Sequence, residues 1–481
     1  MDIQMLIAGQ EADARSGARF ERCNPITGEV VTQAPAASAD DACRAADAAA
    51  AALPAWAALG PTERRRLLLR AADALEQRMA DFTDAMAGET GATAGWAGFN
   101  VRLAAGILRE AASMTTQVGG EVIPSDKPGC LAMAVRKPAG VCLGIAPWNA
   151  PVILGVRAVA MPLACGNTVV LKASELCPRT HQLIGAALQD AGLPAGVVNV
   201  VTNAPADAAE VVSALIAHPA VRRVNFTGST HVGRIIAQQC AGLFKPVLLE
   251  LGGKAPFLVL ADADLKEAVN AAAFGAFMNQ GQICMSTERI VVDDAVADEF
   301  VRRLAEKAAA LPAGDPRGPV VLGSVISQGA ADHVMALIDD AVGKGAVLRS
   351  QPGRQGTVLK AAVLDHVAPG MRIYHEESFG PVVTVVRVRG DEEAVRVAND
   401  TEYGLAAAVF SRDIARALKV AEQIQSGICH INGATVHDEA QMPFGGVKDS
   451  GWGRFGGRSA IAEFTDLRWI TIETQPGHYP F

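Results

Sequence analysis

One cysteine, Cys284, has the surroundings of a nucleophile. It follows the polar segment Asn279-Gln-Gly-Gln-Ile and is followed by Ser286, Thr287 and Glu288 instead of core residues. A thiolate nucleophile needs a partly accessible position with hydrogen-bond donors nearby, and this turn supplies both. The alternative is that Cys284, like most isolated cysteines, is a small buried apolar residue.

A carboxylate, Glu250, is placed for work as a general base. It closes the apolar run Val247-Leu-Leu and precedes Leu-Gly-Gly-Lys254. Ligands bind beyond the carboxyl ends of parallel strands in open α/β sheets, so a carboxylate at this point can reach a water molecule beside a substrate. The alternative is an edge carboxylate that pairs with Lys254.

A side-chain amide, Asn149, comes directly after a third apolar strand. The segment Ala146-Pro-Trp-Asn149 leads through Pro151 into a helix, and proline suits the first turn of a helix. An amide N–H at this point can donate to an oxyanion that develops on a substrate. The alternative is that Asn149 only caps the helix.

Three further turns have the composition of a nucleotide site. The strand that ends in Phe226-Thr-Gly-Ser229 precedes a helix, whose free N–H groups suit a pyrophosphate. Lys172-Ala-Ser-Glu175 follows another strand and is placed to hold a ribose, or is a solvated loop. Glu376-Glu-Ser-Phe379 is an acidic and aromatic turn before an apolar strand.

The N-terminal part of the chain is predicted to be mainly helical. Residues 39–59 contain an Ala-rich helix that ends at Pro54, and apolar residues at helical spacing predict helices over 61–89 and 96–116. The pattern changes at residues 119–140, where prolines and alternating apolar residues predict an antiparallel hairpin.

Strands and helices then alternate as in a parallel sheet covered on both faces. A first block is predicted over residues 141–241, and a second begins with a strand at 247–250 and extends to about 448. The alternating stretch 467–475 predicts a last strand that is ready to join a sheet edge.

The composition excludes several classes of protein. Of 481 residues, 50% are hydrophobic and 20% are charged, with 43 Lys and Arg against 51 Asp and Glu, so the net charge is −8. This is a globular chain without the basic surplus of nucleic-acid proteins. Nine scattered cysteines fit a reducing compartment, and neither a signal peptide nor a membrane span is predicted. We therefore expect a cytoplasmic enzyme that binds neither membranes nor nucleic acid.

In this order, the segments resemble the aldehyde dehydrogenase superfamily over residues 5–475. The matching segments are Pro147-Trp-Asn, Lys172-Ala-Ser-Glu, Phe226-Thr-Gly-Ser-Thr, Glu250-Leu-Gly-Gly, Gly281-Gln-Ile-Cys, Glu377-Ser-Phe-Gly-Pro and Pro443-Phe-Gly-Gly. The resemblance implies an α/β fold: a Rossmann-like dinucleotide-binding domain (1–118 and 141–249) and an α/β catalytic domain (250–448). A small β oligomerisation element (119–140 and 449–481) would form a homodimer or a dimer of dimers.

The resemblance also implies roles for individual residues. Cys284 would attack the aldehyde carbon, Asn149 and the Cys284 backbone N–H would hold the oxyanion, and Glu250 would activate the water that hydrolyses the thioester. The cofactor would be NAD, with NADP weaker, and no metal is implied. The residues implied in binding the cofactor are Trp148, Lys172, Ser174, Glu175, Gly228, Ser229, Glu377 and Phe379.

Two other classes of protein compete with this assignment. A catalytically silent relative would lack Cys284, Glu250 or Asn149, and all three are present. Relatives that pass the acyl group to coenzyme A commonly lack a base at the position of Glu250, so its presence favours hydrolysis.

The expected substrate is an aromatic aldehyde. Arg157 lies two helical turns after Asn149 in an apolar run, where it would bind a phenol or carboxylate, or form an internal salt bridge. Trp96, Ile283 and Met285 would add an apolar wall. The segment around Cys284 resembles bacterial salicylaldehyde and vanillin dehydrogenases, which favours salicylaldehyde. The loop 434–442 lacks the aromatic residue common in relatives that act on aliphatic aldehydes, but succinate semialdehyde remains the alternative.

Overall fold

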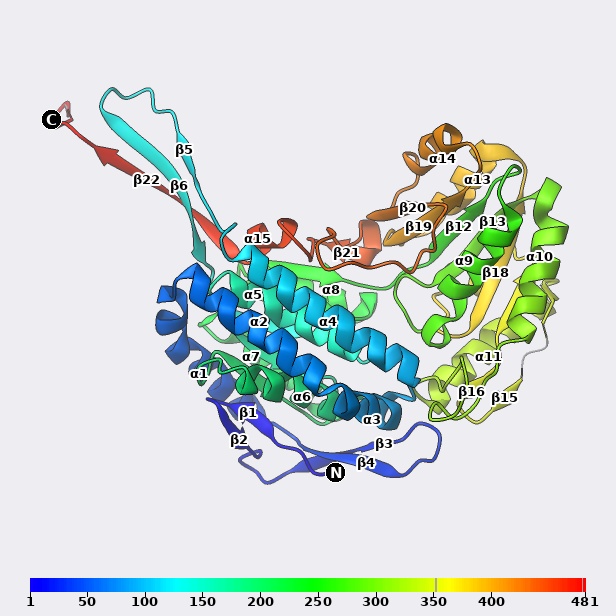
Figure 1. The fold of residues 1–481 in the computed structure, drawn as a ribbon, viewed down its shortest axis with the longest axis horizontal. Coiled ribbons are helices and arrows are strands. Elements are labelled where there is room, and N and C mark those ends of the chain that lie inside the picture. The colour runs from blue at the N-terminus through cyan, green and yellow to red at the C-terminus, as the bar shows by residue number, and fades with distance from the viewer. Residues whose placement is uncertain (351–352, 478) are drawn as a thin grey trace.

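The structure, a computed structural model, describes residues 1–350, 353–477 and 479–481. Two sheets, each covered by helices, lie next to one another, and a thin β arm projects from the end that carries the first sheet (Figure 1). The predicted α/β class is confirmed, since the central strands of both sheets run parallel.

Within the described residues, the first sheet has eight strands. Their order is β2 (Gln10–Ala12), β1 (Met5–Ile7), β9 (Val198–Val201), β8 (Thr168–Lys172), β7 (Val141–Ile145), β10 (Val221–Thr227), β11 (Val247–Glu250) and β21 (Gly451–Trp452). The five strands from β9 to β11 are parallel, so their carboxyl ends share one edge. This edge carries Lys172, Thr227 and Glu250.

The prediction that β11 begins the second block is wrong. Its residues pair in parallel with β10, from Val224 opposite Val247 to Thr227 opposite Glu250. A short apolar strand is compatible with either sheet, and only the tertiary pairing decides. The consequence is that Glu250 and Gly228 end neighbouring strands, and the Gly228 N–H donates to the Glu250 carbonyl oxygen at 3.0 Å.

Helices cover both faces of the first sheet. They are α1 (Ala39–Ala58), α2 (Pro61–Gln77), α3 (Met79–Thr90), α4 (Ala94–Met114), α5 (Pro151–Ala164), α6 (Pro178–Asp190), α7 (Ala208–Ala217) and α8 (Thr230–Gly242). Contrary to prediction, α1 continues through Pro54 to Ala58, and the helix predicted over 61–89 is divided at Arg78, whose backbone leaves the helical region. Every residue of α5 is buried, because it lies between the sheet and α4.

The second sheet is built by the later part of the chain. Its order is β14 (Val347–Leu348), β17 (Ala362–Asp365), β18 (Val382–Val388), β13 (Thr287–Asp293), β12 (Ala255–Val259), β19 (Ala406–Phe410) and β20 (Ile428–Ile431). Its helices are α9 (Leu265–Phe277), α10 (Asp294–Ala309), α11 (Gln328–Gly343), α12 (Arg372–His375), α13 (Gly390–Asn399) and α14 (Ile414–Ala421). The short 3-10 turn Met278–Gly281 follows α9 and carries the chain to Cys284.

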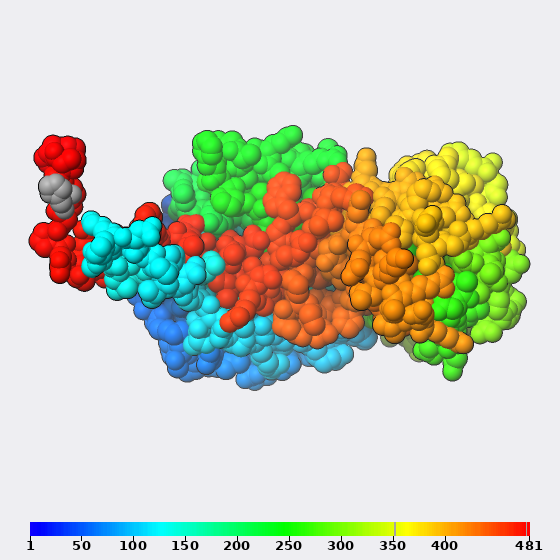
Figure 2. Space-filling view, turned by 90° about the horizontal axis from the view of Figure 1, so that it is seen from above, coloured from blue at the N-terminus to red at the C-terminus, as the bar shows by residue number. Residues whose placement is uncertain are grey.

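The arm is a three-stranded antiparallel sheet. Its strands are β5 (Glu121–Ile123), β6 (Cys130–Pro138) and β22 (Thr465–Glu473), so the predicted hairpin and last strand are both present. In the view from above, the arm projects beyond the rest of the molecule (Figure 2). The last strand, predicted as one ready to join a sheet edge, pairs with β6 of its own chain from Thr465 to Glu473.

The remaining elements are short. They are the β3 (Arg19–Cys23) and β4 (Val30–Pro35) ribbon, the β15 (Arg354–Gln355) and β16 (Val358–Leu359) pair, α15 (Ser459–Glu463) and 3-10 turns at Pro205–Asp207 and Lys448–Ser450. Over the part of the chain that the structure describes, no helix is long and apolar enough to cross a membrane.

Candidate active site

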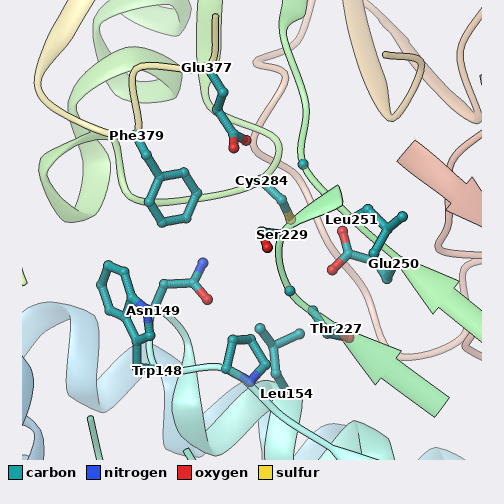
Figure 3. Close-up of a pocket in the computed structure, with 13 residues that line it drawn as sticks. Trp148, Asn149, Leu154, Thr227, Ser229, Glu250, Leu251, Cys284, Glu377 and Phe379 are labelled. Atoms are coloured by element: carbon teal, nitrogen blue, oxygen red, sulfur yellow. The ribbon is translucent and has the colours of Figure 1, made fainter. Parts of the chain in front are cut away.

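A cavity of about 290 Å³ lies beyond the carboxyl ends of β7, β10 and β11. It is lined by Pro147, Trp148, Asn149, Leu154, Thr227, Gly228, Ser229, Glu250, Leu251, Gly252, Cys284, Glu377 and Phe379. Figure 3 shows the Cys284 sulfur between the Glu250 carboxylate on one side and the Asn149 amide and Phe379 ring on the other. Three strand ends and the turn after α9 therefore bring together residues far apart in the sequence.

The turn before Cys284 is held in an uncommon conformation. Asn279 and Gln280 have φ angles of 49° and 57°, in the left-handed region that few residues other than glycine adopt. The Gln280 side chain compensates for this strain, since its amide donates to the Ser324 carbonyl at 2.9 Å and its oxygen accepts from Gly323. Burial raises the pKa of the Cys284 thiol well above its ordinary value, and the nearby Glu250 charge adds to the effect.

Glu250 is a buried carboxylate that lies beside the Cys284 thiol. Neither of its oxygens has a hydrogen-bond partner among the described residues, and burial raises its pKa to about 7. The alternative pairing with Lys254 does not form, because the Lys254 ammonium contacts Glu288 at 2.7 Å and the Glu376 carbonyl at 2.8 Å. A carboxyl group with a pKa near neutrality and no fixed partner is suited to accept a proton from water.

The Asn149 amide is fixed by its neighbours on both loops. Its Nδ2 donates to the Gln282 backbone carbonyl at 2.9 Å, and the backbone carbonyl of Asn149 accepts from Trp96 Nε1 and Asn279 Nδ2, both at 3.0 Å. It does not cap α5, whose N-terminal cap is Ala150 and has no side-chain hydrogen bond. An amide nitrogen has two hydrogens, so one remains for an oxyanion beside Cys284.

Asn279 is a site residue to which the sequence analysis gave no role. Its side chain also reaches the Gln282 carbonyl at 3.3 Å, so it links the Asn149 loop to the loop that carries Cys284. Its position in the polar turn was visible in the sequence, but its partner lies 130 residues away.

The glycine-rich strand ends leave room for a nucleotide. Ser229 caps α8 through a hydrogen bond from the Val232 N–H, and Gly228 and Gly252 line the cavity. A Cβ atom on Gly252 would lie 3.0 Å from the Glu377 carboxylate, so a side chain there would fill space beside it. These features fit a dinucleotide in the crevice at the strand ends.

The turn Glu376–Phe379 is held by a buried ion pair. Glu288, paired with Lys254, accepts hydrogen bonds from the Ser378 N–H and hydroxyl and from the Phe379 N–H. Phe379 has a φ of 47° and contacts Trp148 edge-on, with ring centroids 5.7 Å apart. Burial raises the pKa of Glu377 to about 8, although the Gly253 N–H donates to it.

Three of the predicted cofactor residues lie at the end of β8 and do not line the cavity at Cys284: Lys172, Ser174 and Glu175. The Lys172 ammonium contacts Glu175 at 2.9 Å. Ser174 accepts from the Leu176 N–H through its hydroxyl and donates its own N–H to His181. The Lys172–Glu175 pair follows a parallel strand, as a ribose-binding group would.

A second cavity, of about 340 Å³, meets the first at Asn149, Leu154 and Cys284. Its other lining residues are Trp96, Phe99, Leu103, Ala150, Ile153, Arg157, Phe274, Met278, Ile283, Met285, Val436, His437, Asp438 and Phe444. Trp96 and Phe99 stack with ring centroids 5.5 Å apart. This cavity brings together the four predicted substrate residues.

Arg157 is paired within this wall. Its guanidinium contacts Asp438 at 2.5 Å, and its carbon lies 4.4 Å from the centroid of the Phe444 ring. The internal salt bridge given as the alternative for Arg157 is therefore present, and its partner Asp438 lies in the loop 434–442.

Comparison with known proteins agrees with this geometry. Residues 12–470 match the aldehyde dehydrogenase family. The chain belongs to this family. It is 63% identical to a vanillin dehydrogenase of Pseudomonas fluorescens, with both chains fully covered. A crystal structure of a salicylaldehyde dehydrogenase from Pseudomonas putida G7, complexed with salicylaldehyde, superimposes with a TM-score of 0.98 at 50% identity and full coverage of both chains. A succinate-semialdehyde dehydrogenase from Burkholderia pseudomallei is 35% identical, with a TM-score of 0.95 and 98% of each chain covered.

This aldehyde dehydrogenase therefore has Cys284 at the junction of two cavities. The polar one holds Glu250 and the glycine-rich strand ends, and the other is walled largely by aromatic and aliphatic side chains. The family uses NAD(P), and the features of the first cavity fit such a cofactor.

Proposed function

We propose that this aldehyde dehydrogenase oxidises an aromatic aldehyde that carries a hydroxyl group, such as salicylaldehyde, to the carboxylic acid with NAD. The observation that carries the proposal is the second cavity, which opens at Cys284 and is lined by Trp96, Phe99 and Phe274. Such walls suit a flat aromatic ring. The relatives named for vanillin and salicylaldehyde support the same class.

The residues divide the reaction between them. The Cys284 thiol passes its proton to the neighbouring Glu250 carboxylate, which releases it to solvent, and the thiolate attacks the aldehyde carbon. The resulting oxyanion is held by the free hydrogen of the Asn149 amide and by the Cys284 backbone N–H. NAD, when bound, supplies the hydride acceptor. Glu250 then takes a proton from a water molecule, the resulting hydroxide attacks the thioester carbon, and the acid leaves as the Cys284 sulfur is released.

The ion pair at Arg157 argues against the succinate semialdehyde alternative. A substrate carboxylate would need an unpaired cation in the cavity wall, but Asp438 already neutralises Arg157 at 2.5 Å. Because the pair is neutral overall, it gives a second carboxylate no net attraction. A neutral phenol does not have this disadvantage.

NAD is favoured over NADP by the Lys172–Glu175 pair. A carboxylate at the ribose position accepts hydrogen bonds from the hydroxyl groups and repels a 2′-phosphate. Because the Lys172 charge is engaged with Glu175 at 2.9 Å, little positive charge remains for the phosphate.

Assembly into a homodimer or a dimer of dimers is favoured by the arm. Large apolar side chains on it are exposed, including Val122, Leu467 and Trp469, the last with 76% of its surface accessible. Exposed apolar patches on a projecting element mark an interface. A second copy of the chain would cover them.

A substrate panel tests the proposal. The rate of NADH formation is followed with salicylaldehyde, vanillin, benzaldehyde and succinate semialdehyde, and the products are measured with and without coenzyme A. We expect the highest kcat/KM for a hydroxylated aromatic aldehyde and the free acid as the product in both conditions. A preference for succinate semialdehyde, or acyl-coenzyme A as the product, would refute it.

A further inference from the structure

One residue that lines the aldehyde cavity, Asp438, has a carboxylate oxygen without a partner in the described part of the chain. The side chains of Arg157 and Asp438 are only 6% and 8% exposed, and the pair is formed by Asp438 Oδ2. The other oxygen, Oδ1, is buried and has no hydrogen-bond partner among the residues described. A buried carboxylate oxygen without a donor is unfavourable, and such groups in folded proteins call for an explanation.

The neighbouring polar groups do not supply the missing donor. The Trp96 indole N–H donates to the Asn149 carbonyl, and the Asn149 amide donates to Gln282. His437 is directed towards Glu439, with a nitrogen–oxygen distance of 2.9 Å. Most of the other residues that line the cavity have apolar side chains. A molecule that occupies the cavity can supply this donor.

We infer that Asp438 determines substrate specificity by accepting a hydrogen bond from the phenolic hydroxyl of the aldehyde. The inference rests on the proposed function, since it names the group that the aromatic substrate must carry. Arg157 keeps the carboxylate in place through Oδ2, and stacking on Phe444 keeps Arg157 in place. A small rotation about the soft terminal torsion of the aspartate brings Oδ1 towards a donor, and the Arg157 guanidinium has further N–H groups that can follow Oδ2.

The chemistry of this acceptor distinguishes closely similar aldehydes. A phenol has an O–H to donate, whereas its methyl ether has none and would place a methyl group against a carboxylate. A hydrogen bond to a charged group is worth enough for a roughly tenfold to hundredfold preference. The substrates selected are therefore aromatic aldehydes with a free hydroxyl, and their methyl ethers are selected against.

The test compares each hydroxybenzaldehyde with its own methyl ether. The ratio of the two kcat/KM values is measured for the ortho, meta and para isomers, with wild type and with Asp438→Asn. For the isomer whose hydroxyl reaches Asp438, we expect the ratio to be about tenfold or more in wild type and to fall to within about threefold of one in the variant. The asparagine can turn an N–H donor towards the cavity, which serves the ether oxygen as well as the hydroxyl.

Two features of the design keep the result interpretable. A ratio of two substrates on one preparation does not depend on how much of the variant is folded. Glu439→Gln is the matched control, because Glu439 is the adjacent acid but bonds His437 and Gln441 and does not line the cavity. It should leave the ratio at the wild-type value.

Failure of the inference is distinguishable from failure of the proposed function. If wild type oxidises aromatic aldehydes but shows equal kcat/KM for every phenol and its ether, Asp438 does not bind the hydroxyl group. The same conclusion follows if the ratio survives Asp438→Asn within twofold. If wild type prefers succinate semialdehyde to the whole aromatic panel, the proposed function fails, and the inference fails with it.

Discussion

The buried carboxyl of Glu250 predicts how hydrolysis of the thioester depends on pH. With a pKa of about 7, Glu250 would be ionised in about a tenth of molecules at pH 6 and about nine tenths at pH 8. If the carboxylate is the base, the rate of deacylation should rise by about tenfold over this interval. Glu250→Gln should keep a first turnover of NADH but lose most of the steady-state rate.

The assay must separate the two chemical steps, because Cys284 also ionises more as the pH rises. Rapid mixing resolves the first turnover of NADH from the later release of acid, and only the second rate reports Glu250. A second rate that stays flat from pH 6 to 8 would refute the assignment. So would a Glu250→Gln variant with the wild-type steady-state rate.

Ionisation of Glu250 should lower the free energy of unfolding, whereas ionisation of a carboxyl in a salt bridge raises it. Burial raises the pKa of Glu250 from 4.5 to about 7, so the native state binds its proton more tightly than the unfolded state. Its contribution to stability is present below pH 4.5 and is lost as the pH rises to 7, by about 3 kcal/mol. Glu250→Gln should therefore unfold at a higher temperature than wild type at pH 8, and the difference should shrink at pH 5. Equal melting temperatures at pH 8 would contradict the burial argument.

Four further changes follow from the site and the arm. Cys284→Ala should abolish aldehyde oxidation while calorimetry still detects NAD binding; substantial turnover would remove Cys284 from the mechanism. Glu175→Gln should raise kcat/KM with NADP relative to NAD, because the carboxylate that repels the 2′-phosphate is gone, and an unchanged ratio would count against it. Deletion of residues 467–481 should weaken assembly, since most of β22 is lost, and an unchanged elution volume in gel filtration would oppose this. Trp96→Phe keeps a ring in the cavity but removes the hydrogen bond to Asn149, so kcat should fall several-fold in wild type and not at all in an Asn149→Ala background; equal losses in both would make Trp96 merely structural.

The sequence predicted the parts of the site that depend on local chemistry. Cys284, Glu250 and Asn149 each follow an element that local periodicity identifies, and ligands bind where parallel strands end. The structure brings them to one cavity. Contacts between residues far apart in the sequence could not be predicted from local periodicity. The partner of Arg157 lies 281 residues away in an irregular loop, and the sheet that holds β11 depends on which apolar strand lies beside it.

The position of Cys284 between two unlike cavities explains why both a buried base and an aromatic wall are needed near one sulfur. In the tetrahedral intermediate on Cys284, the aromatic ring lies on one side of the carbon and the hydride leaves on another. One cavity can hold the ring while the other holds the group that accepts the hydride. Water is needed only after the hydride has left, and an unpaired Glu250 in the polar cavity is available for it at that stage. The wall opposite contributes Asp438, whose remaining acceptor can be satisfied by a substrate that carries its own donor. In the proposed mechanism, hydrolysis and specificity depend on two buried carboxylates with different surroundings. Glu250 has no charged partner, so its pKa is near neutrality, whereas Asp438 is paired with Arg157 and is proposed to act as a hydrogen-bond acceptor.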